Sequence, residues 1–509
     1  MSGRFAALDG RCDSRQDAAG KPALAPAVRP PLPLLREPAP VIAPSSLPLH
    51  RLALGAWFVL GCVLRLAGLT VHSLWFDEAM SVWIAANPDI TDVLSRDRSP
   101  PLAFWLLSAW LSVFGVGELA ARSCGAVVSC LTLAVFAVGM RRVLPPRSHQ
   151  LAVAIVAVSP FSVWYGQEVR TYHLVELGAV LWWVAACRLR EAPARAGGWL
   201  AVMAIGAAVA TGAHYTGAYC ALGAGVVAAA LAARRHWRLG ALVAAATAGG
   251  VAAWTWWFVG YLPAQMAMAW GYPKAPGWRD LVEAPFRLLL VAADGMPPAV
   301  LAVAFGAAAL AGLGVARAAR LAAGRGGVAA MALAVVFAVL LGSFLASRSW
   351  RPAFGGRYAI ACEAPLVVLV AIGLTELRVA RLAAWSLVLA LAAVTVWHKT
   401  DDRKEGYRAA CALLAQNWRP GDRIASVTGT FDGFSEAPLF AYLHGTEAFQ
   451  AVVPESRLCE PAGWRRVHVL YREAFYAWPV RDRLLAAFHV VRQEPPVHRV
   501  QYLCLERKD

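Results

Sequence analysis

The stretch LALGAWFVLGCVLRLAGLTVHSLWFDEAMS occupies residues 52–81 and joins a long apolar run to two adjacent carboxylates, Asp77 and Glu78. The apolar part, 52–71, is 20 residues long, which is the length that a helix needs to cross the hydrocarbon core of a bilayer. The acidic pair follows a few residues later. This part of the sequence therefore predicts a membrane helix with two carboxylates at its mouth.

The composition of the whole chain agrees with a membrane protein. Of its 509 residues, 59% are hydrophobic and 16% are charged, and the mean hydropathy is +0.52, whereas soluble domains carry about 25% charged residues. The net charge of +16 would suggest nucleic acid as the partner of a soluble protein. In a membrane protein it follows from basic cytoplasmic loops and anionic lipid, so we predict no nucleic-acid partner.

Ten further apolar runs make the chain a polytopic α-helical membrane protein. The predicted spans are approximately 52–71, 119–140, 150–166, 172–187, 198–213, 216–233, 240–261, 298–317, 328–346, 358–376 and 380–398. The short basic loops should be cytoplasmic; they are 141–150, 188–198, 234–240, 317–327 and 378–381. With eleven crossings the N-terminus lies inside, and the C-terminus lies outside together with Asp77 and Glu78.

One apolar segment does not fit this count. Residues 100–115, PPLAFWLLSAWLSVFG, have the hydropathy of a short span, but a crossing here would invert every later loop. We interpret this segment as a re-entrant or half-depth helix, or as one of a pair with an unrecognised element. The prediction is therefore about 11–13 transmembrane helices.

Three regions divide the chain. Residues 1–50 are rich in Pro and Ala and are predicted to be a disordered cytoplasmic arm. Residues 51–398 form the membrane domain, with a first outer loop at 72–100. In residues 399–509, helix patterns alternate with strand patterns. This alternation predicts a small extracytoplasmic α/β domain. Within it Cys459 and Cys504 are either paired or separate thiols.

Arginines gather on the predicted outer side, where positive charge is normally depleted. They are Arg96, Arg98, Arg170, Arg348, Arg351 and Arg357. One reading is ordinary loop composition. The other is an anionic ligand, because guanidinium forks bind phosphate oxygens bidentately. In SRSWRPAFGGRY (347–358) the arginines stand beside aromatic residues at a membrane boundary, which suits a phosphate carried on a lipid tail.

A second polar cluster, WYGQEVRTYH, occupies residues 164–173. Its Gln167, Glu168, Arg170 and Tyr172 suit binding of sugar hydroxyls and stacking on a sugar ring, and they also suit an aromatic belt with polar caps. His214 in HYTGAY (214–219) is placed with this sugar or acceptor group, although a histidine at a helix end is more often a satisfied cap than a ligand. We expect no required cofactor; a divalent metal is possible but not favoured.

These features fit sugar transfer from a lipid-linked phosphate donor. A carboxylate would deprotonate the acceptor hydroxyl, and cations would stabilise the departing phosphate. P-loop, GxGxxG, HExxH and GxSxG motifs in a fitting context are missing from the sequence. The alternatives are a flippase or transporter for lipid-linked sugars, which would use the same arginines without a catalytic carboxylate, and an inactive scaffold.

Five motifs in order resemble the bacterial GT-C glycosyltransferases of family 39, which includes protein O-mannosyltransferases and the aminoarabinose transferase of lipid A. The resemblance covers about residues 50–400. The motifs are LWFDEAMS, SPPLAFWLLSAWLSVFGVGELAARS, SPFSVWYGQEVRTYHL, HYTG and FGGRYAIACEAPLVVLVAIGL.

The resemblance implies a bacterial inner-membrane enzyme with a polyprenyl-phosphate sugar as donor, a glycan, lipid or protein as acceptor, and inversion at the anomeric carbon. It implies Asp77 as the base with Glu78 as a positioning residue beside it. It places Arg357 and Tyr358 near the lipid phosphate, where Arg351 is also expected. Related chains often have His or Lys before the Pro-Pro pair; here Ser99 stands there, and we assign the missing cation to Arg98.

Overall fold

The structure is a computed structural model that describes part of the chain. The described residues are 47–508 apart from 96, 98, 268–274, 292–295, 326, 350–353, 402–403, 428–433, 460–462 and 473–477. The predicted disordered arm therefore lies almost wholly outside the described residues, and so do Arg98 and Arg351.

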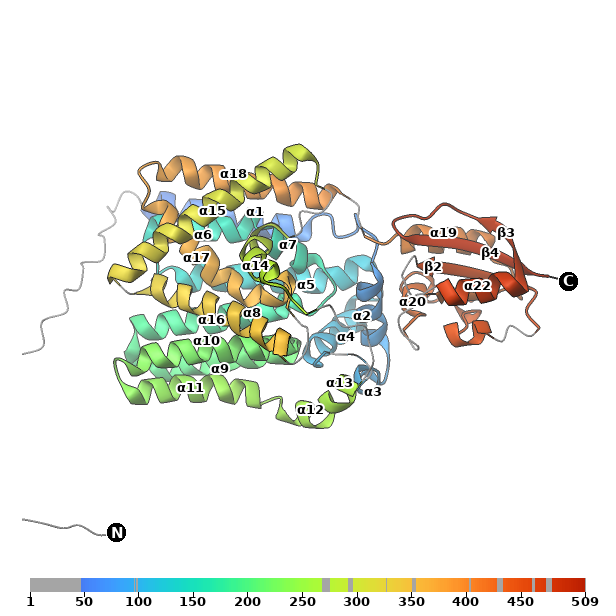
Figure 1. The fold of residues 1–509 in the computed structure, drawn as a ribbon, viewed down its shortest axis with the longest axis horizontal. Helices are drawn as coiled ribbons and strands as arrows, with labels where there is room; N and C mark the ends of the chain where they lie inside the picture. The colour runs from blue at the N-terminus through green and yellow to red at the C-terminus, as the bar shows by residue number, and fades with distance from the viewer. Residues whose placement is uncertain are drawn as a thin grey trace, which may run out of the picture. The chain divides into compact units, whose positions relative to one another are not determined.

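Helices occupy the segments that were predicted as spans (Figure 1). They are α1 (Leu47–Leu66), α5 (Glu118–Met140), α6 (Pro146–Val158), α7 (Pro160–Gln167), α8 (Tyr172–Glu191), α9 (Ala196–Ala213), α10 (Tyr215–Ala233), α11 (Trp237–Ala252), α15 (Pro298–Arg325), α16 (Val328–Ser349), η3 (Gly356–Cys362), α17 (Glu363–Thr375) and α18 (Ala380–Thr400). Among the described residues, seven helices are long and apolar enough to cross a membrane. The predicted fold class, a polytopic helical membrane protein, is confirmed.

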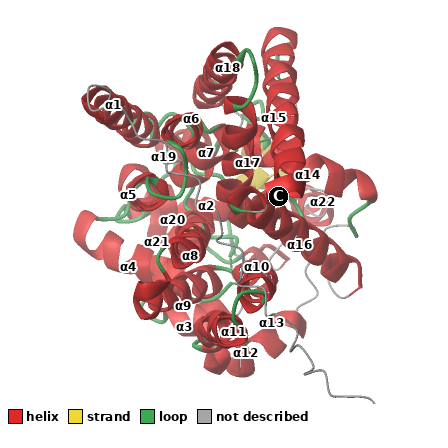
Figure 2. Ribbon diagram, turned by 90° about the vertical axis from the view of Figure 1, so that its left-hand side faces the viewer, coloured by secondary structure: helices red, strands yellow, loops and turns green. Residues whose placement is uncertain are grey.

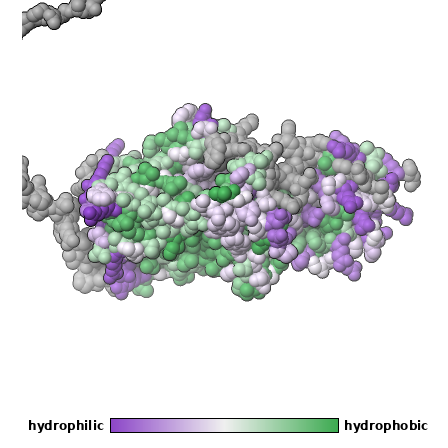
Figure 3. All heavy atoms as spheres, turned by 90° about the horizontal axis from the view of Figure 1, so that it is seen from below, coloured by the Kyte–Doolittle hydropathy of each residue, from purple (hydrophilic) through white to green (hydrophobic). Residues whose placement is uncertain are grey.

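Surface hydropathy agrees with insertion into a bilayer. Apolar side chains cover the sides of the helical bundle, whereas polar side chains gather at its end and over the C-terminal domain (Figure 3). Many large apolar residues on the outward faces are exposed, including Val138, Val226 and Leu382. In water these would be costly, and lipid is the solvent that accepts them.

The predicted span 150–166 is two helices. Helix α6 ends at Val158 and α7 begins at Pro160, because proline has no N–H to continue the helical hydrogen bonds. The Ser159 hydroxyl accepts the N–H of Ser162 and so caps α7. The break sets the direction of α7, whose last residues lead into the polar cluster at 167–173.

Between α1 and α5 the chain forms three short helices, α2 (Phe76–Ala86), α3 (Ile90–Ser95) and α4 (Leu102–Phe114). Helix α4 has 13 residues and is about 20 Å long, too short for a hydrocarbon core of about 30 Å. It packs against α2 and α5. Its length and packing agree with the half-depth helix predicted for residues 100–115.

Helix α14 (Trp278–Leu290) was not predicted from the sequence. Its charged residues alternate with its apolar ones, so the segment has no continuous apolar run. Glu283 accepts hydrogen bonds from Arg279 and Arg287 on the exposed side, while Ala284 and Leu288 are buried. Two further short helices, α12 (Thr255–Gly260) and α13 (Leu262–Ala267), follow α11. Helix α12 takes up residues that the sequence assigned to the end of a span at 240–261, and α13 lies beyond that span.

The C-terminal domain is a four-stranded sheet with helices on both faces (Figure 1). The strand order is β1-β2-β4-β3, with β1 (Arg423–Val427) parallel to β2 (Arg466–Arg472), and β4 (Val500–Arg507) antiparallel to both β2 and β3 (Phe488–Gln493). The helical elements are α19 (Tyr407–Asn417), α20 (Ala437–Leu443), α21 (Glu447–Gln450), η4 (Glu455–Cys459) and α22 (Trp478–Ala487).

Alternate residues of the strands face the two helical layers. Ile424 and Leu470 pack with α19, whereas Ala425, Val469 and Leu505 pack in the core that includes α22. This is the small α/β domain that the sequence predicted. Cys504 is buried as a free thiol in β4, and the side chain of Cys459 lies outside the described part.

Candidate active site

The two adjacent carboxylates lie in the first turn of α2 and have different environments. Successive residues of a helix point about 100° apart, so the backbone separates the two side chains. Glu78 is fully buried, whereas Asp77 is partly exposed. The pair therefore consists of one interior carboxylate and one that faces open space.

Glu78 is held by two cations. Arg122 of α5 donates from Nε to Oε1 at 2.9 Å and from Nη2 to Oε2 at 2.7 Å, and Nζ of Lys404 lies 2.9 Å from Oε2. The N–H of Val169 also donates to Oε1 at 3.1 Å. Burial alone would raise the pKa of Glu78, but Arg122 and Lys404 outweigh it and lower the pKa to about 2. Both carboxylate oxygens of Glu78 therefore have hydrogen-bond partners and the group is ionised, so it is poorly suited to accept a proton at neutral pH.

Arg122 also organises the loop before α2. It is 2% exposed and donates to the carbonyl oxygens of Leu69, His72 and Ser73 at 2.8, 2.5 and 3.0 Å. Together with the two bonds to Glu78, these three contacts use the five N–H donors of the planar guanidinium. Arg122 and Glu78 together fix the start of α2 against α5. Sequence reasoning missed Arg122, although an arginine in the first turns of an apolar helix is itself a signal of a functional or structural role.

The chain segment that leads into the C-terminal domain completes this arrangement. Besides its contact with Glu78, Nζ of Lys404 lies 3.9 Å from Oε1 of Glu168 and 5.0 Å from the ring centre of Trp164. The neighbouring Glu405 accepts the N–H of Phe76 at 2.9 Å and so caps the N-terminus of α2. Neither residue was predicted, because both are more than 320 positions from α2 in the sequence.

A further contact joins the C-terminal domain to the first loop. The Tyr442 hydroxyl of α20 donates to Glu118 at 2.5 Å and accepts the N–H of Leu74 at 2.6 Å. Arg408 of α19 also pairs with Glu118 and donates to the carbonyl oxygens of Thr70 and His72. The position of α2, and hence of Asp77, thus depends on both the membrane helices and the C-terminal domain.

The carboxylate of Asp77 receives no hydrogen bond from any residue that the structure describes. Its backbone oxygen lies 3.4 Å from Nη1 of Arg170, which also donates to the Ser81 hydroxyl at 3.2 Å. Burial lowers the pKa of Arg170, but the nearby Asp77 and Tyr172 outweigh that effect and raise it. Asp77 is therefore a free carboxylate beside a permanently charged guanidinium.

Arg357 lies in an aromatic cluster near this carboxylate. Its guanidinium is 5.8 Å from the ring centre of Tyr172 and 5.2 Å from that of Tyr358, and it donates to the Tyr358 hydroxyl at 3.3 Å. Arg357 has no ion pair within the described part of the chain, yet Asp77 and Glu168 both act on it electrostatically. An unpaired guanidinium between tyrosine rings is suited to bind an anion.

His214 belongs to the same cluster but acts as a helix cap. Its Nδ1 accepts the N–H of Thr216 at 3.2 Å at the start of α10, and its ring stacks on Tyr358 at 5.4 Å. Burial, with Arg170 and Arg357 nearby, lowers the pKa of His214 to about 3. The ring is neutral at physiological pH, and its free nitrogen can serve as a hydrogen-bonding group.

Glu168 is near Glu78 and the cations Lys404, Arg170 and Arg357, which all act on it electrostatically. Burial raises its pKa, although Lys404 opposes that effect. Its Oε2 is buried and has no hydrogen-bond partner among the described residues. A buried carboxylate with a free oxygen is costly unless a ligand or a proton satisfies it.

Gln167 points away from this cluster. Its Nε2 donates to the carbonyl oxygens of Leu64, Arg65 and Ala67, and its Oε1 accepts Nζ of Lys399 at 3.0 Å. All its amide groups are thus used to join the ends of α1, α7 and α18. The structure does not bring Gln167 to the predicted sugar-binding group, because the turn after α7 directs Glu168, Arg170 and Tyr172 inward instead.

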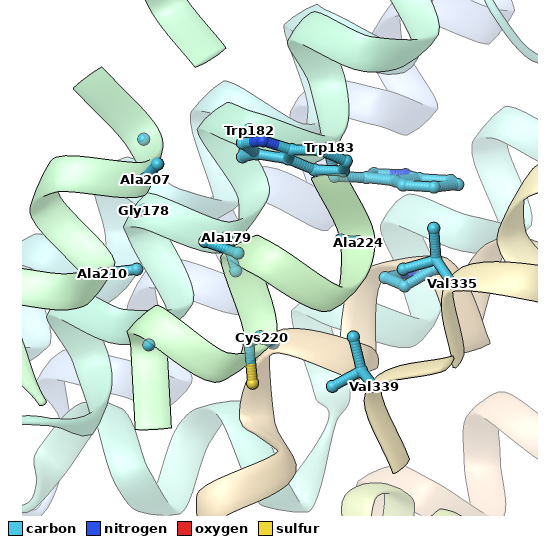
Figure 4. Close-up of a pocket in the computed structure, with 15 residues that line it drawn as sticks. Gly178, Ala179, Trp182, Trp183, Ala207, Ala210, Cys220, Ala224, Val335 and Val339 are labelled. Atoms are coloured by element: carbon cyan, nitrogen blue, oxygen red, sulfur yellow. The ribbon is translucent and has the colours of Figure 1, made fainter. Parts of the chain in front are cut away.

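A narrow apolar pocket of about 20 Å³ lies inside the bundle (Figure 4). Alanine and glycine residues of α8, α9 and α10 line it, with Val335 and Val339 of α16 and the rings of Trp182 and Trp183. Cys220 connects the pocket to the cluster, since its Sγ lies 4.0 Å from the carbonyl oxygen of Tyr358. In the described part of the chain no group of three or more His, Cys, Asp and Glu is placed to hold a metal ion.

Comparisons with known proteins agree with this architecture. A model of the dolichyl-phosphate-mannose-protein mannosyltransferase family matches residues 98–257. ArnT from Cupriavidus metallidurans in the apo state is similar with a TM-score of 0.61 at 14% identity, over 90% of this chain and 98% of ArnT. The same enzyme bound to undecaprenyl phosphate gives 0.55 at 15% identity, over 91% and 98%.

The Archaeoglobus fulgidus oligosaccharyltransferase in the apo form gives a TM-score of 0.51 at 12% identity, over 82% of this chain and 69% of that one. No curated protein matches the sequence. Residues 98–257 are thus similar to this mannosyltransferase family, and the chain is a membrane protein that shares its fold with ArnT and the oligosaccharyltransferase, as the sequence motifs indicated.

Proposed function

We propose that the protein is a glycosyltransferase that moves a sugar from a polyprenyl-phosphate donor to an acceptor hydroxyl on the extracytoplasmic side of the bacterial inner membrane. The matched family is described by transfer from dolichyl phosphate, and one similar ArnT structure holds undecaprenyl phosphate. These observations support a lipid-linked phosphate as the donor.

The observation that carries the proposal is the contrast between Asp77 and Glu78. Glu78 is neutralised by Arg122 and Lys404, whereas the Asp77 carboxylate is free, partly exposed and close to Arg170. Asp77 would accept the proton of the acceptor hydroxyl, which is the task of a general base. Glu78 would act as a positioning residue by holding α2 in place.

The reaction would proceed as one displacement. The acceptor oxygen loses its proton to Asp77 and forms a bond to the anomeric carbon, while the bond from that carbon to the phosphate oxygen breaks. The electron pair of the broken bond stays on the phosphate, which Arg357 would stabilise with Tyr358. Attack opposite to the leaving phosphate inverts the anomeric carbon. Arg98 and Arg351, which lie outside the described residues, stay proposed partners of the phosphate.

The sugar and the acceptor would bind between Asp77 and the aromatic cluster. Glu168 offers a buried unpaired oxygen, and Tyr172 and His214 offer ring faces. Arg170 would bind there through its remaining donors. This assignment gives each of these residues a task and requires no metal.

The test compares three strains: wild type, a deletion, and Asp77→Asn at normal protein level. Mass spectrometry would measure polyprenyl-phosphate sugars and envelope glycans. We expect Asp77→Asn and the deletion to accumulate the same lipid-linked sugar and to lose that sugar from one glycan. If Asp77→Asn matches wild type while the deletion has a defect, Asp77 is not a base, and transport of the lipid becomes the better account.

A further inference from the structure

A cleft lies at the end of the bundle opposite the candidate active site, between α1 and α18. Figure 2 shows these two helices standing apart, with α6 between them. The cleft has a volume of about 320 Å³, which is at the lower end of the range of ligand sites in proteins. Its walls come from Trp57 of α1, Leu151 and Ala154 of α6, and Trp385 and Val388 of α18.

Two arginines stand at the mouth of this cleft, with polar groups beside them. Arg147 is the second residue of α6 and Arg381 is the second residue of α18, and Gln150 and Thr375 also line the cavity. Both arginines are exposed, and neither forms an ion pair or hydrogen bond with any residue that the structure describes. Two unneutralised guanidinium groups on one cavity favour an anion.

The apolar walls extend inward from these arginines on two helices in parallel. Arg147 to Ala154 on α6 and Arg381 to Val388 on α18 each span seven residues, or about 10 Å along a helix. The rings of Trp57 and Trp385 lie 5.8 Å apart across the cleft. A charged mouth over a narrow apolar slot of this depth has the chemistry of a phospholipid, whose phosphate lies at the interface and whose chains lie below it.

The two helices are joined at the other end. Lys399 of α18 donates to the carbonyl oxygens of Leu64 and Ala67 at 2.8 and 2.6 Å, close to the loop that carries Asp77. Helices α1 and α18 thus form a wedge, closed at the candidate active site and open at the arginines. Nothing in the described chain fills the open end.

We propose that this cleft binds one anionic phospholipid of the leaflet opposite the candidate active site. Arg147 and Arg381 bind its phosphate, and one acyl chain lies along Trp57, Leu151 and Trp385. Basic pockets between membrane helices bind anionic headgroups in this way. The site differs from that of the proposed donor, since it lies at the other end of α1 and α18.

The experiment measures lipid retained by the delipidated full-length protein. Native mass spectrometry would count bound dioleoyl-phosphatidylglycerol, with dioleoyl-phosphatidylcholine as the neutral-headgroup comparison. We expect Arg147→Ala/Arg381→Ala to weaken phosphatidylglycerol binding about thirtyfold. The matched control is Arg234→Ala/Arg238→Ala, which removes the same number of charges at the same end of the bundle but outside the cleft; it should bind as wild type.

A second variant tests the apolar part independently. Ala384 also lines the slot, so Ala384→Phe fills it and leaves both arginines in place; this variant should reduce lipid retention even if the double arginine variant does not fold. Equal phosphatidylglycerol binding by wild type and Ala384→Phe would overturn the proposal. So would equal loss in the arginine double variant and its control, or equal retention of phosphatidylcholine and phosphatidylglycerol by wild type.

Discussion

Replacing Glu78 by Gln should destabilise the protein strongly, although the side chain keeps its size. The substitution removes one negative charge from a buried group that touches Arg122 and Lys404. Arg122, at 2% exposure, would then remain buried without its counter-charge. An amide can still accept one hydrogen bond, so the change tests the charge rather than the packing.

The magnitude follows from the pKa of Glu78. Burial raises that pKa, but Arg122 and Lys404 bring it down from the usual 4.5 to about 2. At about 1.36 kcal/mol for each step of one in pKa, the ionised form gains about 3 kcal/mol on folding. Removing one partner of a buried ion pair costs about 3–5 kcal/mol, so the two routes agree. The melting temperature should fall by several degrees, on the order of 5 °C.

The effect should depend on pH in a defined direction. Because the folded pKa lies below the unfolded one, the stabilisation is fully present above about pH 4.5 and is lost as the pH falls towards about 2. The difference in melting temperature between wild type and Glu78→Gln should therefore shrink over this window. A difference that grows on acidification would contradict the assignment.

The assay is thermal unfolding of the purified protein in detergent. The matched control is Glu283→Gln, which also removes a carboxylate between two arginines, but on the exposed face of α14; surface pairs of this kind contribute little. We expect a clear shift for Glu78→Gln and none resolved for Glu283→Gln. Equal shifts would refute the reasoning that burial makes the Glu78 contacts important.

Three further variants test other parts of the site. Lys404→Met leaves Glu78 with Arg122 as its one cation, so it should slow transfer without preventing expression. Unchanged activity in a turnover assay would show that Lys404 does not help to position α2. Arg357→Lys keeps the charge but loses the planar fork, so donor affinity should fall about tenfold, measured as KM or Kd for the donor; unchanged affinity would remove it from the phosphate site. Tyr442→Phe loses its bonds to Leu74 and Glu118 and should cost about 1–3 kcal/mol, with faster hydrogen exchange over residues 67–76; equal protection would show that the hydroxyl does not hold the loop.

Apolar run length was sufficient to predict the membrane domain, because the bilayer imposes one length and forbids open backbone. It failed at α14, whose outward face is charged through Arg279, Glu283 and Arg287. It also gave no sign that the span at 150–166 breaks at Pro160. The local hydropathy pattern indicates whether a helix is surrounded by lipid or by water, but it does not indicate which other helices pack against it.

Most of the predicted site residues belong to short polar clusters in the sequence. Asp77 with Glu78, and Glu168 with Arg170 and Tyr172, stood out as polar clusters at span ends. Arg122 and Lys404 did not, because their role depends on contacts made across the fold with Glu78. Those contacts also give Asp77 and Glu78 different environments, and this difference cannot be read from two adjacent acidic residues in a sequence.

The central claim is that Asp77 takes the acceptor proton, and donor turnover by the purified protein tests it most directly. The donor would be the lipid-linked sugar that accumulates in the deletion strain, and the measurement is release of polyprenyl phosphate by wild type and Asp77→Asn of equal melting temperature. Loss of a general base lowers kcat by about 10²- to 10⁴-fold, and we expect a fall in this range with little change in KM for the donor. Turnover by Asp77→Asn within about twofold of wild type would contradict the account.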